Sequence, residues 1–128
     1  MTEYSTDSHL NANCALIAEE LEAHANGRAY NDENGDVIIL DGDDEPTDEM
    51  EYRGLYDFIN DALDIAITRG LAGDYRGAKL YMNMTFGGPT IWVDTRTGFV
   101  EGRWAGNSCS KWVDSDAIDE LNDGLITS

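Results

Sequence analysis

The apolar residues change their spacing along the chain, and this change predicts the fold class. From Leu10 to Ala25 they recur every three or four positions, which is the period of one face of an α-helix. Residues 55–65 keep that spacing and predict a second helix. From Tyr75 to Phe86 apolar and polar residues alternate instead, as in a strand with one buried face. Helical and alternating patterns in separate parts of one chain predict an α+β fold.

The C-terminal third adds further elements. Strands are predicted at 90–94 and 99–104, joined by a tight turn, and a short edge strand at 109–113 is the fourth candidate. A last helix is predicted over 115–125, with Ser115 as its N-cap. Neighbouring strands joined by short turns favour antiparallel pairing. We therefore expect a three- to four-stranded antiparallel meander with about three helices.

A hairpin signal and a polar loop separate the first two helices. The Asn34-Gly35 pair lies between short β-forming runs at 28–30 and 37–40, which predicts a small extra hairpin. Residues 41–51 hold seven acids and a proline without any apolar period, and they predict a loop. A chain of this length forms one domain, so residues 1–128 are expected to be a single acidic α+β unit.

Charge is distributed as unevenly as the apolar residues. The chain carries 26 acidic and eight basic side chains, a formal net charge of −18. Residues 1–66 hold 18 acids and two Arg, residues 67–113 three acids and six bases, and residues 114–128 five acids and no base. Such a charge opposes folding by self-repulsion, so we interpret it as serving a basic partner outside the chain. Direct binding of nucleic acid or an anionic membrane is disfavoured, because each phosphate contact needs a cation.

Three groups of acids are candidates for contacting that partner. Double-stranded DNA presents about one negative charge per 1.7 Å of axis, and a protein that copies it needs carboxylates at several-ångström spacing on rigid elements. The two predicted acidic helices meet this requirement, and the loop adds charge density. The candidate residues are Asp41, Asp43, Asp44, Glu45, Asp48, Glu49 and Glu51 in the loop, Asp57, Asp61 and Asp64 on the second helix, and Asp119, Glu120 and Asp123 on the last helix.

Two alternatives to a basic partner stay open. Halophilic or solubility adaptation would give an accessory protein with no specific partner; the presence of only two Lys favours it, and the net basic middle of the chain disfavours it. The spacing of Asp32, Asn34 and Asp36 copies the start of a calcium-binding loop and would make the chain a weak calcium-binding regulator. Val37 stands where such a loop needs Gly, so an ordinary turn is favoured and no metal site is expected.

Catalytic and redox signals are weak. No nucleophile elbow, phosphate-binding loop or zinc-ligand spacing occurs, so we expect neither enzymatic activity nor a cofactor. Cys14 lies on the apolar face of the first helix, which favours a buried free thiol over a disulfide with Cys109. The N-terminus lacks the basic and apolar regions of a secretory signal and no membrane span is present, so a cytoplasmic location is expected.

The basic middle of the chain is also rich in aromatic residues. A sheet that stacks nucleobases is one interpretation of this combination. With a net charge of −18 we favour the other, in which the rings form the core and the cations neutralise neighbouring acids. An exposed aromatic patch would instead indicate a homodimer or a docking surface. The residues concerned are Tyr81, Trp92, Phe99, Trp104 and Trp112, beside Arg76, Lys79, Arg96 and Arg103.

Residues 87–106 carry a resemblance to known proteins. The sequence Gly-Gly-Pro-Thr-Ile-Trp-Val-Asp-Thr-Arg-Thr-Gly-Phe-Val-Glu-Gly-Arg-Trp-Ala-Gly resembles small acidic proteins carried by prophages and conjugative elements of gut bacteria. In size and charge the chain also resembles DNA-mimic inhibitors, namely antirestriction proteins of the ArdA type and acidic anti-CRISPR proteins. The resemblance implies an inhibitor that blocks the DNA-binding channel of a host restriction–modification complex or CRISPR effector, in the host cell cytoplasm.

Overall fold

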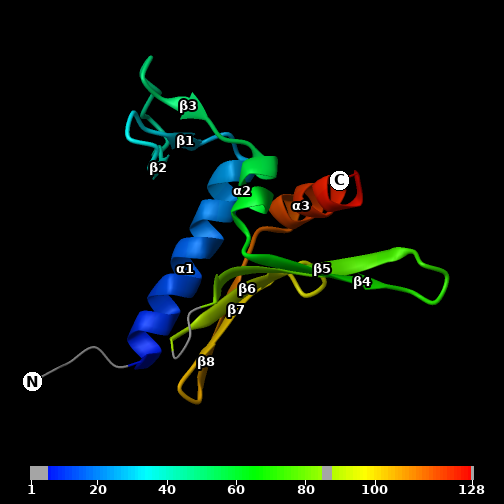
Figure 1. Cartoon of the computed structure of the whole chain (residues 1–128). Coiled ribbons are helices and arrows are strands. Elements are labelled where there is room, and N and C mark those ends of the chain that lie inside the picture. The colour runs from blue at the N-terminus through cyan, green and yellow to red at the C-terminus, as the bar shows by residue number, and fades with distance from the viewer. Residues whose placement is uncertain (1–5, 85–87, 128) are drawn as a thin grey trace, which may run out of the picture.

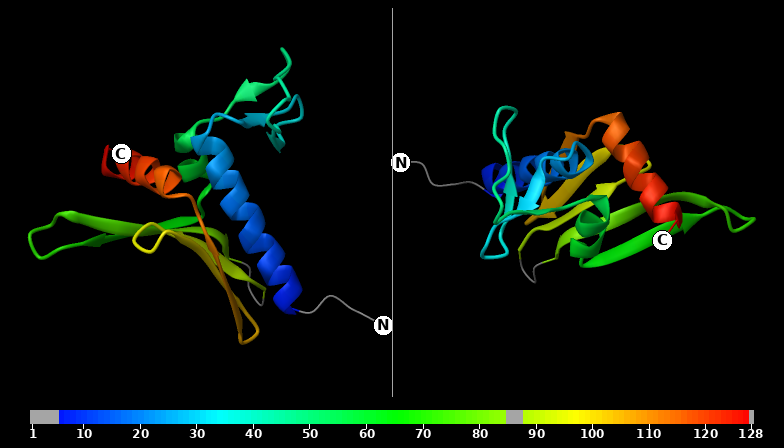
Figure 2. Two further views of the ribbon diagram at one scale, coloured as in Figure 1. Left: turned by 180° about the vertical axis from the view of Figure 1, so that it is seen from behind. Right: turned by 90° about the horizontal axis from the view of Figure 1, so that it is seen from above.

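The structure is a computed structural model that describes residues 6–84 and 88–127. In this part of the chain there are three helices, a three-stranded sheet and a five-stranded sheet (Figure 1). The helices gather on one side of the larger sheet, and the smaller sheet projects from the end of the long first helix (Figure 2). The predicted α+β class is confirmed.

The larger sheet is an antiparallel meander in which each strand pairs with the next. Its order is β4-β5-β6-β7-β8, so it has five strands where three or four were expected. β6 and β7 have the predicted bounds, and the edge strand β8 begins two residues earlier than expected. The strands are β4 (Asp64–Arg69), β5 (Tyr75–Met84), β6 (Thr90–Asp94), β7 (Phe99–Trp104) and β8 (Asn107–Trp112).

The additional strand, β4, replaces the end of the predicted second helix. Helix α2 (Leu55–Asp61) ends because the backbone of Ala62 is extended, with a ψ of 136°. Pairing with β5 then begins, as the Leu63 N–H donates to the Tyr81 carbonyl at 2.7 Å. The segment that follows is rich in β-branched residues, which favour strands. The helical spacing of the apolar residues predicted a helix that continues to Ile65, and this end is wrong, because the helix stops at Asp61.

The core lies between the helices and the larger sheet. Helix α1 (Thr6–Ala25) crosses β7 and β8, and α2 and α3 (Ser115–Thr127) pack beside it. Gly102 on β7 permits the close approach, because a Cβ there would lie 3.0 Å from both the Leu10 and Cys14 side chains. The largest fully buried side chains include Leu10, Leu21, Phe58, Leu80, Ile91, Val93, Val100 and Leu121.

The two cysteines form a disulfide, contrary to the free thiols that we expected. Pairing of β7 with β8 places Cys109 opposite Gly102, at the point where α1 crosses, and Cys14 lies on α1 above it. The Cys14–Cys109 bond joins residues 95 positions apart. The helical period marks Cys14 only as an apolar residue of a helix face and gives no means of placing Cys109 beneath it.

The last helix begins at Ser115, the residue that was predicted to be its N-cap. The Ile118 N–H donates to the Asp114 carbonyl at 3.1 Å, so Asp114, and not Ser115, takes the N-cap position. The backbone N–H of Asp114 is in turn held by the Glu22 carboxylate on α1 at 2.9 Å. This contact fixes the start of α3 against α1.

Among the helices of residues 6–84 and 88–127, none combines the length and the apolar composition of a membrane-spanning segment.

The smaller sheet contains the predicted hairpin and one further strand. β1 (Ala29–Asn31) pairs with β2 (Val37–Ile39) on one side and with β3 (Glu51–Tyr52) on the other. The Asp32 carboxylate accepts the backbone N–H groups of Asn34 and Asp36 at 2.8 and 2.9 Å. Gly35 has a φ of +85° in the same turn. The residues with calcium-loop spacing thus form an ordinary turn, which the Asp32 side chain stabilises.

Candidate acidic binding surface

The smaller sheet and its long loop form one acidic projection, which we call the acidic arm (residues 28–54). It holds ten acidic residues and two arginines. In Figure 1 it extends from the C-terminal end of α1, away from the larger sheet. All seven predicted loop acids are exposed, and none is seen to form an ion pair within the described residues: Asp41, Asp43, Asp44, Glu45, Asp48, Glu49 and Glu51.

The loop is held at both of its ends. β2 precedes it, β3 follows it, and both strands pair with β1. Two turns shape the loop between them: the Asp44 N–H donates to the Asp41 carbonyl at 2.9 Å, and the Met50 N–H donates to the Thr47 carbonyl at 3.1 Å. Strand pairing at both ends and these two turns therefore restrict the backbone of the loop, and with it the positions of the carboxylates.

A buried arginine attaches the arm to the helices. Arg53, 7% exposed, follows β3 and comes shortly before α2. Its Nε donates to His24 Nε2 on α1 at 3.0 Å, and one Nη donates to Asn31 Oδ1 on β1 at 3.2 Å. The other Nη forms an ion pair with Asp61 on α2. One guanidinium thus joins α1, β1 and α2.

His24 completes this network as a neutral side chain. Its Nε2 accepts from Arg53, so Nδ1 carries the hydrogen and donates to the Glu20 carbonyl at 2.6 Å. Burial lowers the pKa of the imidazole, and the positive charge of Arg53 lowers it further. The ring also packs edge-on against Phe58, with centroids 5.3 Å apart. No motif in the sequence had given His24 a role.

The Glu20 side chain lies beside the same network. Burial raises the pKa of its carboxyl, and the negative charge of Asp61 raises it further. Glu20 and Asp61 both line a hollow of about 270 Å³ between α1, α2 and the larger sheet. Neither the arginine network nor this neighbouring carboxyl was predicted. The available signal was that Arg53 is one of only two bases in the first 66 residues.

The three acids assigned to the second helix do not form the predicted row. The Asp57 carboxylate accepts the Gly54 N–H at 2.8 Å and caps α2. Asp61 is paired with Arg53, so part of its charge is neutralised inside the molecule. Asp64 is not helical: it begins β4 and is paired in register with Tyr81. The prediction of a row of three acids on this helix is wrong, because the helix ends at Asp61, before Asp64.

The acids of the last helix lie where they were predicted. Asp119, Glu120 and Asp123 are exposed on α3. Both views show α2 between α3 and the arm (Figures 1 and 2). The predicted acids therefore form two separate groups, one on the arm and one on α3.

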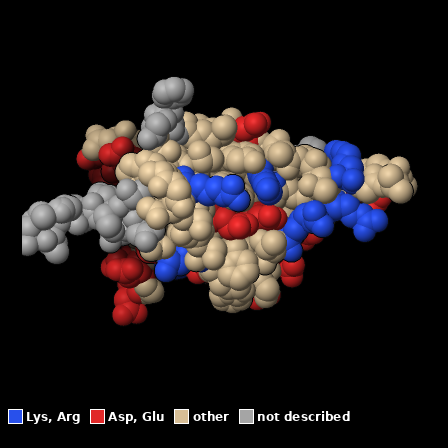
Figure 3. All heavy atoms as spheres, turned by 90° about the horizontal axis from the view of Figure 1, so that it is seen from below, with Lys and Arg blue, Asp and Glu red and all other residues tan. Residues whose placement is uncertain are grey.

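A band of basic side chains lies on the opposite side of the molecule from the arm. The face of the larger sheet that the helices leave uncovered, which we call the open face, carries a band of Lys and Arg with a few acids between them (Figure 3). Alternation along β5 and β7 places Lys79 and Arg103 on this face, while Leu80 and Val100 face the helices. Arg96 lies across Gly77, where it fills the space of the missing Cβ.

The aromatic residues of the middle segment lie mainly on the open face, contrary to the core position that we favoured. Trp104 packs against the core, but Phe99 and Trp112 are paired on the outside of β7 and β8, and Trp112 is 61% exposed. Tyr81 contacts Trp92, with ring centroids 6.0 Å apart. Lys79 and Arg103 lie over the Trp92 ring, 5.7 and 5.9 Å from its centroid.

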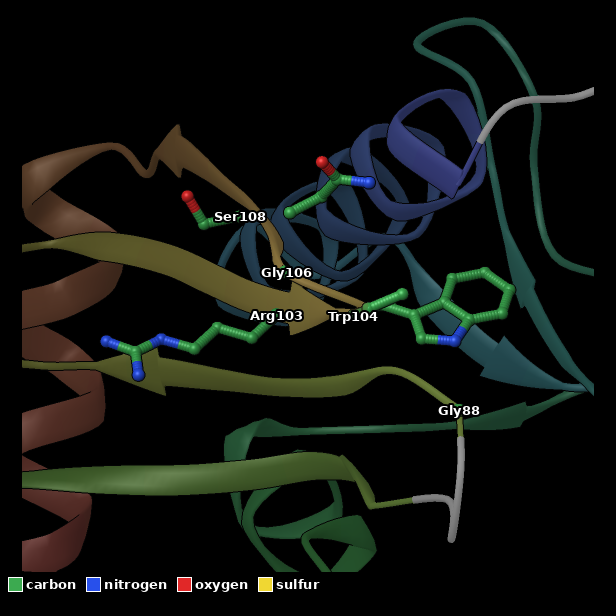
Figure 4. A pocket seen from close by; sticks show the side chains of 7 residues that line it. Gly88, Arg103, Trp104, Gly106 and Ser108 are labelled. Atoms are coloured by element: carbon green, nitrogen blue, oxygen red, sulfur yellow. The ribbon is translucent and has the colours of Figure 1, made fainter.

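A hollow of about 490 Å³ lies at the tip of the β7–β8 hairpin (Figure 4). Arg103 and Trp104 point away from each other there, as successive residues of a strand must. The turn contains Ala105 and Gly106 at φ of +52° and +85°, an arrangement that favours Asn-Gly over Ala-Gly. The described lining supplies one cation, an indole, an amide and a hydroxyl, which do not make a catalytic set.

The acidic residues also do not converge on a metal position. Among the described residues no group of three or more His, Cys, Asp or Glu side chains is placed to hold an ion. The chain matches no protein-family model, and no curated protein and no solved structure is significantly similar to it.

Proposed function

We propose that this protein is a DNA-mimicking inhibitor of a host nucleic-acid-binding defence enzyme. The target is a restriction–modification complex or a CRISPR effector, and the inhibitor occupies the channel that would otherwise bind DNA. The observation that supports this most directly is the acidic arm, where seven exposed carboxylates project on a loop held at both ends. Arg and Lys side chains that grip DNA phosphates can bind such carboxylates with similar geometry.

The positions of the acids support a smaller contact set than the thirteen candidates. The loop acids make the main contact, because no ion pair within the described residues neutralises them. The acids of α3 form a second group on the far side of α2. Asp61 pairs internally and Asp64 lies on the larger sheet, so both are left out of the contact surface.

Inhibition by occupancy has distinct kinetic properties. No bond is made or broken, so the dose is nearly stoichiometric with the target. Opposite net charges steer the two proteins together and make association fast at low salt. Because the Debye length falls to about 8 Å at physiological ionic strength, added salt weakens the complex.

The test is a DNA-cleavage assay with purified restriction–modification complexes and CRISPR effectors, into which the protein is titrated. The arm variant Asp43→Asn/Asp44→Asn/Asp48→Asn is compared with the α3 variant Asp119→Asn/Glu120→Gln/Asp123→Asn. A control, Glu19→Gln/Asp64→Asn/Asp74→Asn, removes the same number of charges from other surfaces. We expect the arm variant to lose at least about tenfold in potency, which corresponds to about 1.4 kcal/mol of binding free energy. Equal potency of the arm variant and the control would reject the arm as the mimic surface. A wild-type protein that inhibits none of these enzymes would instead favour a solubility or halophilic role.

A further inference from the structure

We infer that the open face is a homodimer interface, on which a second copy of this chain packs about a two-fold axis. This inference does not rest on the proposed function, because it concerns the side of the molecule away from the arm. The occupant follows from the charge of the open face, its aromatic residues and one buried donor.

Charge favours a second copy because the open face carries bases as well as acids on a strongly acidic protein. Strand register and the position of Arg96 over Gly77 place charges of both signs on it: Lys79, Arg96 and Arg103, and Asp64, Asp94 and Glu101. Everywhere else two copies that each carry −18 repel one another. The arm extends away from the larger sheet (Figure 1), so a two-fold dimer built on the open face would keep the two arms far apart, where their mutual repulsion is weakest.

The distribution of charge on the face is complementary to itself. One cross-strand row runs from Asp64 through Tyr81, Trp92 and Glu101 to Ser110, with its two acids on β4 and β7. Lys79 and Arg103 lie in the rows on either side of it. In a two-fold interface residue i contacts residue j and j contacts i, so the bases of this face can pair with Asp64 and Glu101 of the second copy.

Aromatic residues supply the apolar part of the interface. Phe99 and Trp112 form a cross-strand pair at the β8 side of the face. Trp is enriched at the energetic centre of protein interfaces, because a large ring loses much contact with water when it is covered. Burial of Trp112 by a second copy accounts for a ring that is 61% exposed in the single chain.

One buried donor on this face has no acceptor in the single chain. Trp92 is 9% exposed, and its Nε1 is buried without a hydrogen-bond partner among the described residues. A hollow of about 280 Å³ lies beside Trp92, lined also by Glu101, Arg103, Ser108 and Ser110. A buried donor without an acceptor is costly. A side chain of the second copy that enters the hollow brings an acceptor within reach of this indole.

Sedimentation equilibrium of two charge variants tests the interface. Asp64→Lys/Glu101→Lys changes the open face, and Asp119→Lys/Glu120→Lys changes α3, so both variants have a net charge of −14, four units less negative than the wild type. If only net charge mattered, both would associate more strongly than wild type. We expect the α3 variant to dimerise at least as well as wild type and the open-face variant to dimerise at least about tenfold less.

Mixing provides the complementary measurement. Lys79→Glu/Arg103→Glu makes the open face acidic, and we expect it to be monomeric alone but to form a heterodimer with Asp64→Lys/Glu101→Lys. Circular dichroism checks that each variant is folded. If one of the charge variants is unfolded, Trp112→Ser, which we also expect to weaken the dimer, takes its place. Moderate salt strengthens the wild-type dimer by screening the overall repulsion, whereas it weakens arm binding to a basic target. The inference is overturned if the wild type is monomeric at its highest attainable concentration, or if the two Lys variants associate equally.

Discussion

The acidic arm and the five-stranded sheet are held in place by different forces. The sheet is fixed by apolar side chains such as Leu80, Val93 and Val100, which are fully buried against the helices. The arm has few buried apolar residues and is attached mainly by the polar contacts of Arg53. Charge and stability thus reside in different parts of the molecule. The exposed acids can therefore be changed at little cost to the free energy of unfolding.

The largest effect should come from a hole in the sheet. Leu80→Ala removes a fully buried side chain, and we expect a loss of about 2–5 kcal/mol in the free energy of unfolding measured with urea. The arm variant Asp43→Asn/Asp44→Asn/Asp48→Asn is the matched comparison. It should stay within about 0.5 kcal/mol of wild type, as exposed substitutions usually do. Similar losses in both variants would remove the distinction between the two regions.

Reduction of the disulfide should be the next largest effect. Cys14–Cys109 closes a long loop within the body of the protein. Its loss is expected to cost about 2–4 kcal/mol, seen as a lower urea midpoint in the presence of dithiothreitol. Cys14→Ala/Cys109→Ala, which cannot respond to the reductant, is the control. Mass spectrometry that finds two free thiols in the native protein would contradict this prediction.

Loss of the arginine network should loosen the arm alone. Arg53→Met removes hydrogen bonds to His24 and Asn31 and leaves Asp61 without its ion-pair partner, with an expected local cost of about 2 kcal/mol. Hydrogen exchange should accelerate at the Leu40 amide, which donates to Arg28 in the arm, but not at the amides of β6. Arg28→Met removes one contact to the Leu40 carbonyl and should have the smaller effect. Uniform acceleration across both regions would show that the arm and sheet unfold together.

The smallest effect concerns pH. The lowered pKa of His24 means that the folded protein binds this proton less tightly than the unfolded chain. Its contribution to stability is complete above about pH 6.5 and is lost as the pH falls below that value. The raised pKa of Glu20 acts with the opposite sign. We therefore compare wild type with His24→Gln, which does not titrate there, and expect the wild type to lose stability relative to it as the pH falls from about pH 7 to about pH 5. An NMR titration that gives His24 a pKa above 6.5 would refute this.

Much of the fold could be predicted from local sequence patterns. The alternation in β5 and the helical spacing in α1 are strong, because each of these elements buries one face. The bound of α2 and the existence of β4 depend on pairing with β5, which no local pattern near Asp64 contains. The disulfide likewise depends on Cys109 lying across from Gly102.

The candidate site was predictable in composition but not in arrangement. The exposure of the loop acids follows from charge alone, since ionised groups stay in water. That Asp61 is paired with Arg53 depends on how the chain folds back between β3 and α2. The outward position of Trp92 and Trp112 was missed because aromatic residues were assigned to the core without following the strand register through Val93 and Val113.

The short strands of the arm make its tip exchangeable. β3 has only two residues, and the loop before it makes few backbone contacts beyond its own turns. Doubling the length of a flexible loop costs only about 0.6 kcal/mol. Tips of other lengths and sequences can therefore be grafted between Leu40 and Glu51 while the remainder of the molecule serves as an unchanged scaffold.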